Sequence, residues 1–173
     1  MSSIQHFNFQ VETIKESKAK ALKVFHLDSI YYQDKFLISF KFRNISNSTS
    51  PQGHFYWLIH WASGQAVSND FDIPSLRSGE NWVSTQYETD ALAEGYGLIY
   101  VAYSSPRGTV FQFYFGNKIV SPIYPKYSGI SIASIKAKKK EELYEFWGMM
   151  IAAIGLLIVA LEKIISFLYY LLV

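Results

Sequence analysis

The C-terminal residues 146–173 are the feature that most constrains this chain. Residues 146–161 carry no charge, Glu162 and Lys163 interrupt the run, and ten mostly apolar residues follow. As one helix the stretch would be about 42 Å long, against roughly 30 Å for the hydrocarbon core of a bilayer. The sequence therefore predicts a transmembrane helix. The alternative is an unusually apolar helix buried in the core of a soluble domain.

The residues around this helix predict its orientation. The beginning of the chain shows neither an apolar h-region nor a small-residue cleavage site, so no signal peptide is visible. One span at the C-terminus is then typical of a tail-anchored protein. Four lysines, which we call the basic neck, precede the span: Lys136, Lys138, Lys139 and Lys140. Because only Lys163 is basic after that point, the positive-inside rule predicts that the soluble part lies in the cytoplasm.

Small and polar residues of the span share one face of the predicted helix. Steps of three and four residues from Gly148 lead to Ser166 and Tyr170 at about 100° per residue. Small residues let helices approach closely in lipid, and a carboxylate prefers protein or water to acyl chains. We therefore predict a self-association face, the small-residue stripe: Gly148, Ala152, Gly155 and Glu162. Lys163 of a neighbouring helix would pair with Glu162. Alternatively, this charged pair marks where the helix leaves the bilayer.

Composition excludes several classes of function. The chain has 173 residues, enough for one domain of about 120 to 140 residues and the helix. Its formal net charge of +2 gives no reason to expect direct nucleic-acid binding. The absence of cysteine excludes disulfides, a thiol nucleophile and cysteine-ligated zinc, and it is compatible with a reducing cytoplasm.

Alternating apolar residues predict strands through the middle of the chain. In residues 35–43, four apolar side chains alternate with polar ones: Phe36, Ile38, Phe40 and Phe42. Six or seven such segments are spaced about eight to twelve residues apart. The predicted fold is mainly β, an immunoglobulin-like antiparallel β-sandwich followed by a single C-terminal transmembrane α-helix. Its predicted parts are an N-terminal segment 1–23, a sandwich 24–120, a Pro-containing linker with the basic neck 121–143, and the helix 144–173.

Two details resemble immunoglobulin-like domains. Residues 91–103 resemble the E–F corner of that fold, in which a tyrosine, here Tyr96, opens strand F and bonds back to the preceding turn. Trp57 falls in the strand where such folds keep a core tryptophan. The cysteines of antibody domains are missing, so the resemblance is to the wider immunoglobulin-like class.

A second group of lysines lies near the N-terminus: Lys15, Lys18, Lys20 and Lys23. Such a cluster is either a solvated face or a contact with an anionic surface. Together with the basic neck, these lysines are the predicted contacts with anionic lipid.

No pattern in the sequence predicts catalysis, a cofactor or a metal site. The candidate bases and ligands are His6, His26, His54 and His60. His54 and His60 share one strand face but lie about 20 Å apart, too far to share a metal. His26 and Asp28 also share a face, where an ordinary surface or core histidine is the simpler interpretation. The many aromatic residues are expected to pack the core, with stacking on nucleobases as the alternative.

Two classes of function fit this layout. A cytoplasmic β domain joined to one polar-striped span resembles membrane effectors of prokaryotic immune systems, including those encoded beside short Argonaute proteins. That resemblance implies a β domain that receives a signal or protein partner, helices that assemble as a homo-oligomer, and depolarisation of the membrane in antiviral defence. The alternative is a passive tail-anchored adaptor or a small subunit of a membrane complex.

Overall fold

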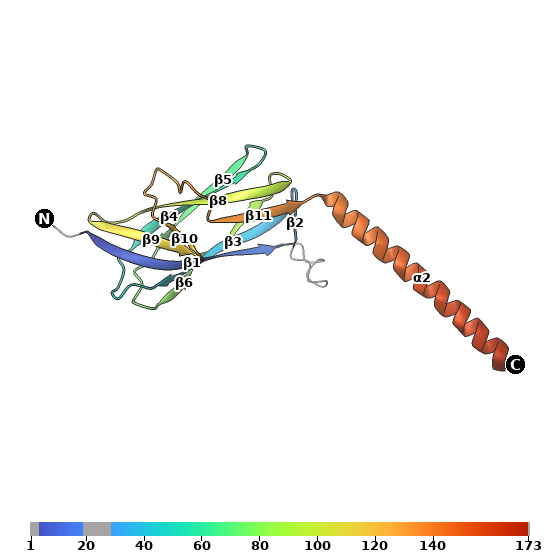
Figure 1. Ribbon diagram of the computed structural model, residues 1–173. Helices are drawn as coiled ribbons and strands as arrows, with labels where there is room; N and C mark the ends of the chain where they lie inside the picture. Colours follow the sequence, from blue (N-terminus) through green and yellow to red (C-terminus); the bar gives the residue numbers. More distant parts are fainter. Residues whose placement is uncertain (1–3, 19–28, 173) are drawn as a thin grey trace. The chain divides into compact units, whose positions relative to one another are not determined.

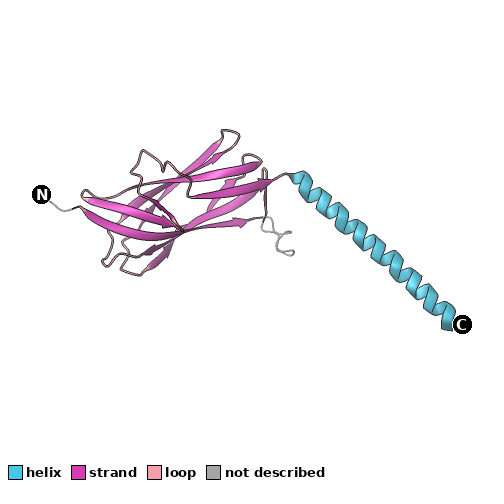
Figure 2. Cartoon of the chain, in the orientation of Figure 1, coloured by secondary structure: helices cyan, strands magenta, loops and turns pink. Residues whose placement is uncertain are grey.

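The computed structural model describes residues 4–18 and 29–172 (Figure 1). It divides into two units, Met1–Lys138 and Lys139–Val173. The first is a β-sandwich and the second is one helix, as Figure 2 shows in magenta and cyan. The prediction of a mainly β sandwich followed by a single C-terminal helix is therefore confirmed.

Two sheets face each other across the sandwich. The larger sheet has the order β10-β9-β1-β3-β6, with β7 also paired to β3. Its strands are β1 (Gln5–Ser17), β3 (Lys35–Asn44), β6 (Asn81–Val83), β7 (Tyr87–Asp90), β9 (Thr109–Phe115) and β10 (Lys118–Val120). The smaller sheet has the order β2-β11-β8-β4-β5. Its strands are β2 (Ile30–Tyr31), β4 (Gly53–Trp61), β5 (Ala66–Ile73), β8 (Gly95–Ser104) and β11 (Ala133–Lys138). Pairing is antiparallel except between β1 and β9 and between β11 and β2.

The core forms where the alternating apolar faces of the two sheets meet. Phe40 and Phe42 of β3 are fully buried, and so is Phe55 of β4. Their rings pack across the sandwich: the ring centroid of Phe55 lies 5.2 Å from that of Phe40 and 5.1 Å from that of Phe42. Trp57 is 1% exposed, which confirms its predicted place in the core. Aromatic packing thus accounts for the aromatic-rich strands, because these side chains bury large apolar areas.

The sandwich extends beyond the predicted range 24–120 at both ends. β1 lies inside the segment expected to precede the sandwich, and its Phe7 and Phe9 are buried in the core. β11 lies inside the predicted linker, with Ile135 and Ala137 buried. The sequence interpretation missed β11 because its inward Ile135 and Ala137 alternate with outward lysines, a strand pattern that resembles a basic linker.

Two other local predictions are not confirmed. Tyr96 is 54% exposed on β8, and its hydroxyl makes no hydrogen bond to the preceding turn among the described residues, so the predicted corner is not formed. The first residues of the predicted sandwich, 24–28, lie outside the described residues, and so do His26 and Asp28.

The C-terminal unit is the helix α2 (Lys140–Leu172). The most apolar 18-residue window of Lys140–Tyr170 has a mean hydropathy of 2.3, and by length and composition this helix can cross a membrane. At 1.5 Å per residue, α2 is about 50 Å long, which exceeds the hydrocarbon core. A β domain with one such helix is consistent with a single-pass membrane protein.

Candidate functional site

The candidate site of the sandwich lies where β1 loses one of its two neighbours. β3 pairs with β1 from Phe9 to Ser17, whereas β9 pairs with it only from Gln5 to Gln10. Beyond Gln10, one edge of β1 has no partner strand among the described residues. A strand edge without a neighbour leaves backbone N–H and C=O groups available to a ligand.

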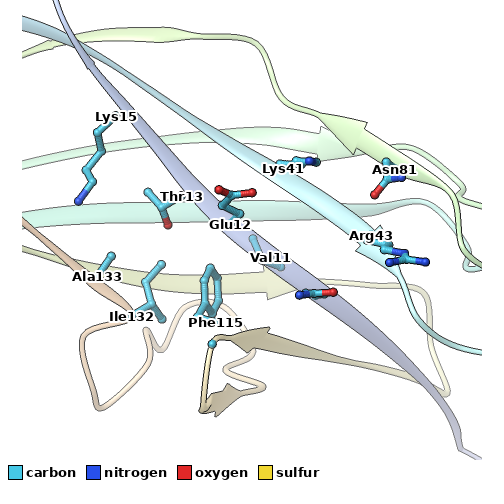
Figure 3. A pocket seen from close by; sticks show the side chains of 12 residues that line it. Val11, Glu12, Thr13, Lys15, Lys41, Arg43, Asn81, Phe115, Ile132 and Ala133 are labelled. Carbon is cyan, nitrogen blue, oxygen red and sulfur yellow. The ribbon is translucent and has the colours of Figure 1, made fainter. Parts of the chain in front are cut away.

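A groove of about 530 Å³ lies along this open edge (Figure 3). We call it the edge groove; β1, β3, β6, the end of β9 and the start of β11 contribute to it. Its lining residues are Gln10, Val11, Glu12, Thr13, Lys15, Lys41, Arg43, Asn81, Phe115, Gly116, Ile132 and Ala133. A cleft of this size is typical of small-molecule sites.

Cations dominate the ionisable groups of the edge groove. Lys41 and Arg43 lie on β3, where Lys41 is directly opposite Glu12 in the register. Lys15 lies further along β1, and its Nζ donates a hydrogen bond to the Ser134 carbonyl at 2.8 Å. Burial lowers the pKa of Lys15. With three cations and one carboxylate, the groove favours an anionic group.

Unpaired polar groups also face the edge groove. Lys18 N donates to Lys35 O, and Ile45 N donates to Asn8 O, so the even-numbered residues of β1 direct their backbone groups toward β3. The backbone N–H groups of Thr13 and Lys15 therefore point to the open side. The Thr13 hydroxyl oxygen is buried and has no hydrogen-bond partner among the described residues. Figure 3 shows it directed toward the side of Ile132 and Phe115.

Apolar side chains complete the edge groove. Val11 is 4% exposed, Phe115 7% and Ile132 6%, so they form a floor rather than a loose rim. A ligand that combines an anionic group with an apolar part would match both halves of the lining.

The structure separates the predicted lipid-contacting lysines. Lys15 lines the edge groove, whereas Lys18 forms an ion pair with Glu88, which Lys35 also contacts at 2.9 Å. Lys20 and Lys23 lie outside the described residues. In the basic neck, Lys136 and Lys138 belong to β11, Lys140 begins α2, and Lys139 lies between them. None of the four neck lysines lines the edge groove.

Sequence reasoning missed Lys41 and Arg43. The alternation of residues 35–43 places both on the polar face of a strand, and both are exposed on β3. Their role depends on β1 as the neighbouring strand, and on the point at which β9 ends. No local pattern reports that long-range pairing, so the sequence held no signal for the edge groove.

The small-residue stripe lies on α2 and is exposed in the single chain. A Cβ atom added to Gly148 or Gly155 would meet no atom within 4 Å. Both glycines therefore leave space for another helix to approach closely. Self-association through this face stays a prediction.

A second polar cluster lies on the smaller sheet. His54 of β4 bonds Asp72 through Nδ1 and Asp70 through Nε2, both at 2.6 Å. Burial lowers the pKa of His54, but the hydrogen bonds to Asp72 and Asp70 raise it, and the balance is a raised pKa. Across residues 4–18 and 29–172, no group of three or more His, Cys, Asp or Glu residues could hold a metal.

This cluster predicts a pH-dependent contribution to stability. Because the folded pKa of His54 is raised, its stabilisation is complete below the unfolded pKa of about 6.5 and is lost as pH rises through the folded pKa. The melting temperature of the full chain in detergent should therefore fall as pH rises from about 6.5 to 8.5. His54→Gln should flatten this slope. An unchanged slope in the variant would show that other groups cause it.

Comparisons with known proteins add two distant structural likenesses. The Bordetella pertussis ApaA protein has 11% identity and a TM-score of 0.47, and the match covers 78% of this chain and 97% of that one. The CARDB domain of the Pyrococcus furiosus PF1109 protein, solved in complex with di-metal ions, has 12% identity and a TM-score of 0.44, and the match covers 80% and 93%. No protein-family model matches the sequence, and no curated protein matches it.

Proposed function

We propose that this protein is a membrane effector whose β-sandwich lies in the cytoplasm, binds anionic lipid and receives a protein partner. Its C-terminal helices then associate through the small-residue stripe and permeabilise the membrane. The observation that carries the proposal is a cationic groove with an apolar floor, on a sandwich joined directly to a helix of membrane-spanning length.

The short connection supports a role at the membrane surface. Only Lys139 separates β11 from α2, and the uncharged run of α2 begins at Phe146. The six residues of helix before that run measure about 10 Å. The headgroup zone of one leaflet is roughly 5 to 8 Å thick. The sandwich is thus tethered close to lipid headgroups, not on a long linker.

Anionic lipid fits the chemistry of the edge groove. The Lys15, Lys41 and Arg43 side chains supply positive charge, and the Thr13 hydroxyl and backbone N–H supply donors for phosphate oxygens. Each basic residue near an anionic leaflet contributes about 1 kcal/mol. Glycerol and the first acyl carbons would lie on the apolar floor. The basic neck adds further positive charge beside the membrane.

Self-association of α2 would relieve the cost of its charged pair. A carboxylate such as that of Glu162 costs roughly 2.5–3.5 kcal/mol at the centre of a span, on insertion scales. Pairing with Lys163 of a neighbouring helix, or exposure to water inside an assembly, would offset that cost. Gly148 and Gly155 would permit the close contact that this arrangement needs.

An antiviral role follows from the resemblance to immune effectors, in which an activated partner triggers depolarisation. The second candidate is a passive tail-anchored adaptor, because the same layout serves a protein that only holds a partner at the membrane. The two candidates differ in whether expression of the protein depolarises the membrane.

The test is expression of the full chain in bacteria that contain a voltage-sensitive dye. The effector proposal predicts depolarisation, absent in cells that express a chain ending before Phe146. External protease on intact cells should spare the sandwich. An unchanged potential at high membrane abundance would favour the adaptor, and digestion from outside would overturn the cytoplasmic orientation.

A further inference from the structure

Three exposed isoleucines gather on one side of the sandwich. Ile119 of β10 is 57% exposed, and Ile123 and Ile130 of the β10–β11 connection are 58% and 52% exposed. All three line one shallow depression of about 520 Å³. We call them the isoleucine patch. Single exposed apolar residues are normal, but large β-branched side chains gathered in one place mark an interaction surface.

The segment that carries the isoleucine patch is basic in sequence, and the acid near it in space is Asp70, on the side of Tyr127. Residues 95–140 include no Asp or Glu, although both occur throughout the preceding part of the chain. Lys126 lines the same depression as the isoleucines. Lys118 lies beside it on β10, and its Nζ donates to the Ser131 carbonyl at 2.6 Å. Exposed apolar side chains bordered by lysines complement an anionic lipid surface, where the lysines meet headgroups.

The short connection to α2 keeps the sandwich, and with it the isoleucine patch, near the membrane. The sandwich ends at Lys138, one residue before the helix, so it is confined near the headgroups once α2 spans the bilayer. An apolar patch held there meets lipid at high effective concentration. We propose that the isoleucine patch inserts into the interfacial zone of an acidic bilayer and anchors the sandwich to the membrane surface. This proposal rests on the proposed function only in that α2 spans the membrane.

If the patch inserts, docking of the sandwich on the membrane should depend steeply on the isoleucines. Each of them still exposes about half of its surface, and burial of that remainder should favour the docked sandwich about tenfold per residue. Substitution by serine should therefore shift the sandwich toward the detached state by that factor. The fold should survive, because these side chains are exposed. The matched control is Ile45→Ser, since Ile45 is 44% exposed and lies outside the patch.

The chain contains no cysteine, so single labels can be placed without a background. Full-length Ile123→Cys and Ile45→Cys carry an environment-sensitive fluorophore in vesicles of phosphatidylglycerol and phosphatidylcholine. We expect lipids with a spin label near the headgroup to quench the label at 123 and not the one at 45. Ile119→Ser with Ile130→Ser should reduce that quenching, and so should pure phosphatidylcholine vesicles.

Three results would overturn the proposal. In the first, the label at 123 and the label at 45 respond alike to spin-labelled lipid and to aqueous iodide. Alternatively, the label at 123 is shielded from iodide but is not quenched by lipid, which would mean that protein covers the patch. In the third, quenching of the label at 123 persists unchanged in the variant that combines Ile119→Ser with Ile130→Ser. A failure here leaves depolarisation intact, whereas loss of depolarisation with normal quenching would contradict the effector proposal alone.

Discussion

Gly155→Leu should abolish membrane depolarisation by this protein while the sandwich remains folded. Gly155 has open space around it, so leucine fits the single chain without strain. In an assembly, the added side chain would occupy the volume that a neighbouring helix needs. Overpacking of a close contact costs about 1–3 kcal/mol, enough to reduce association by about five- to one-hundred-and-fiftyfold. Voltage-dye fluorescence measures the functional loss, and crosslinking in membranes measures the loss of assembly.

The adjacent residue provides the control. Leu156 is 73% exposed and lies off the small-residue stripe, so Leu156→Ala removes apolar contact with lipid and little else. We expect near-normal crosslinking and depolarisation from this variant. If the two substitutions behave alike, the small-residue stripe has no role and α2 is a simple anchor.

The sequence predicted the fold class because two signals are strong and local. The uncharged run of α2 and the alternation of residues 35–43 both specify their elements without tertiary information. β1 was harder to identify, because its inward positions change from Phe9 to Thr13 and Lys15 where the strand leaves β9. The inward face thus loses its apolar pattern at the place where the groove opens.

The candidate site shows the limit of local reasoning more clearly. Lys15 was singled out from a cluster of lysines, but its neighbour Lys18 is engaged with Glu88, more than sixty positions away in the chain. Lys41 and Arg43 acquire their role from the register with β1, and the apolar floor comes from β9 and the start of β11. Sequence spacing predicts which face a residue occupies, but long-range pairing decides which faces meet.

The double variant Lys41→Gln and Arg43→Gln should weaken binding of short-chain phosphatidylserine to the full-length protein in detergent by about thirtyfold. Two basic residues are lost, and each contributes roughly 1 kcal/mol near an anionic group. Both side chains are exposed, so glutamine should not disturb the core beneath them. Titration calorimetry measures the affinity directly, with short-chain phosphatidylcholine as the neutral ligand.

A matched pair elsewhere on the sandwich separates local from global charge. Arg77→Gln with Arg107→Gln removes the same two charges from exposed sites outside the edge groove, and should leave the affinity nearly unchanged. Salt provides an independent check, because the Debye length falls from about 10 Å at 0.1 M to about 3 Å at 1 M. Native binding should weaken over that range more than binding by the groove variant. Equal losses in the two double variants would mean that net charge, not the edge groove, attracts the lipid.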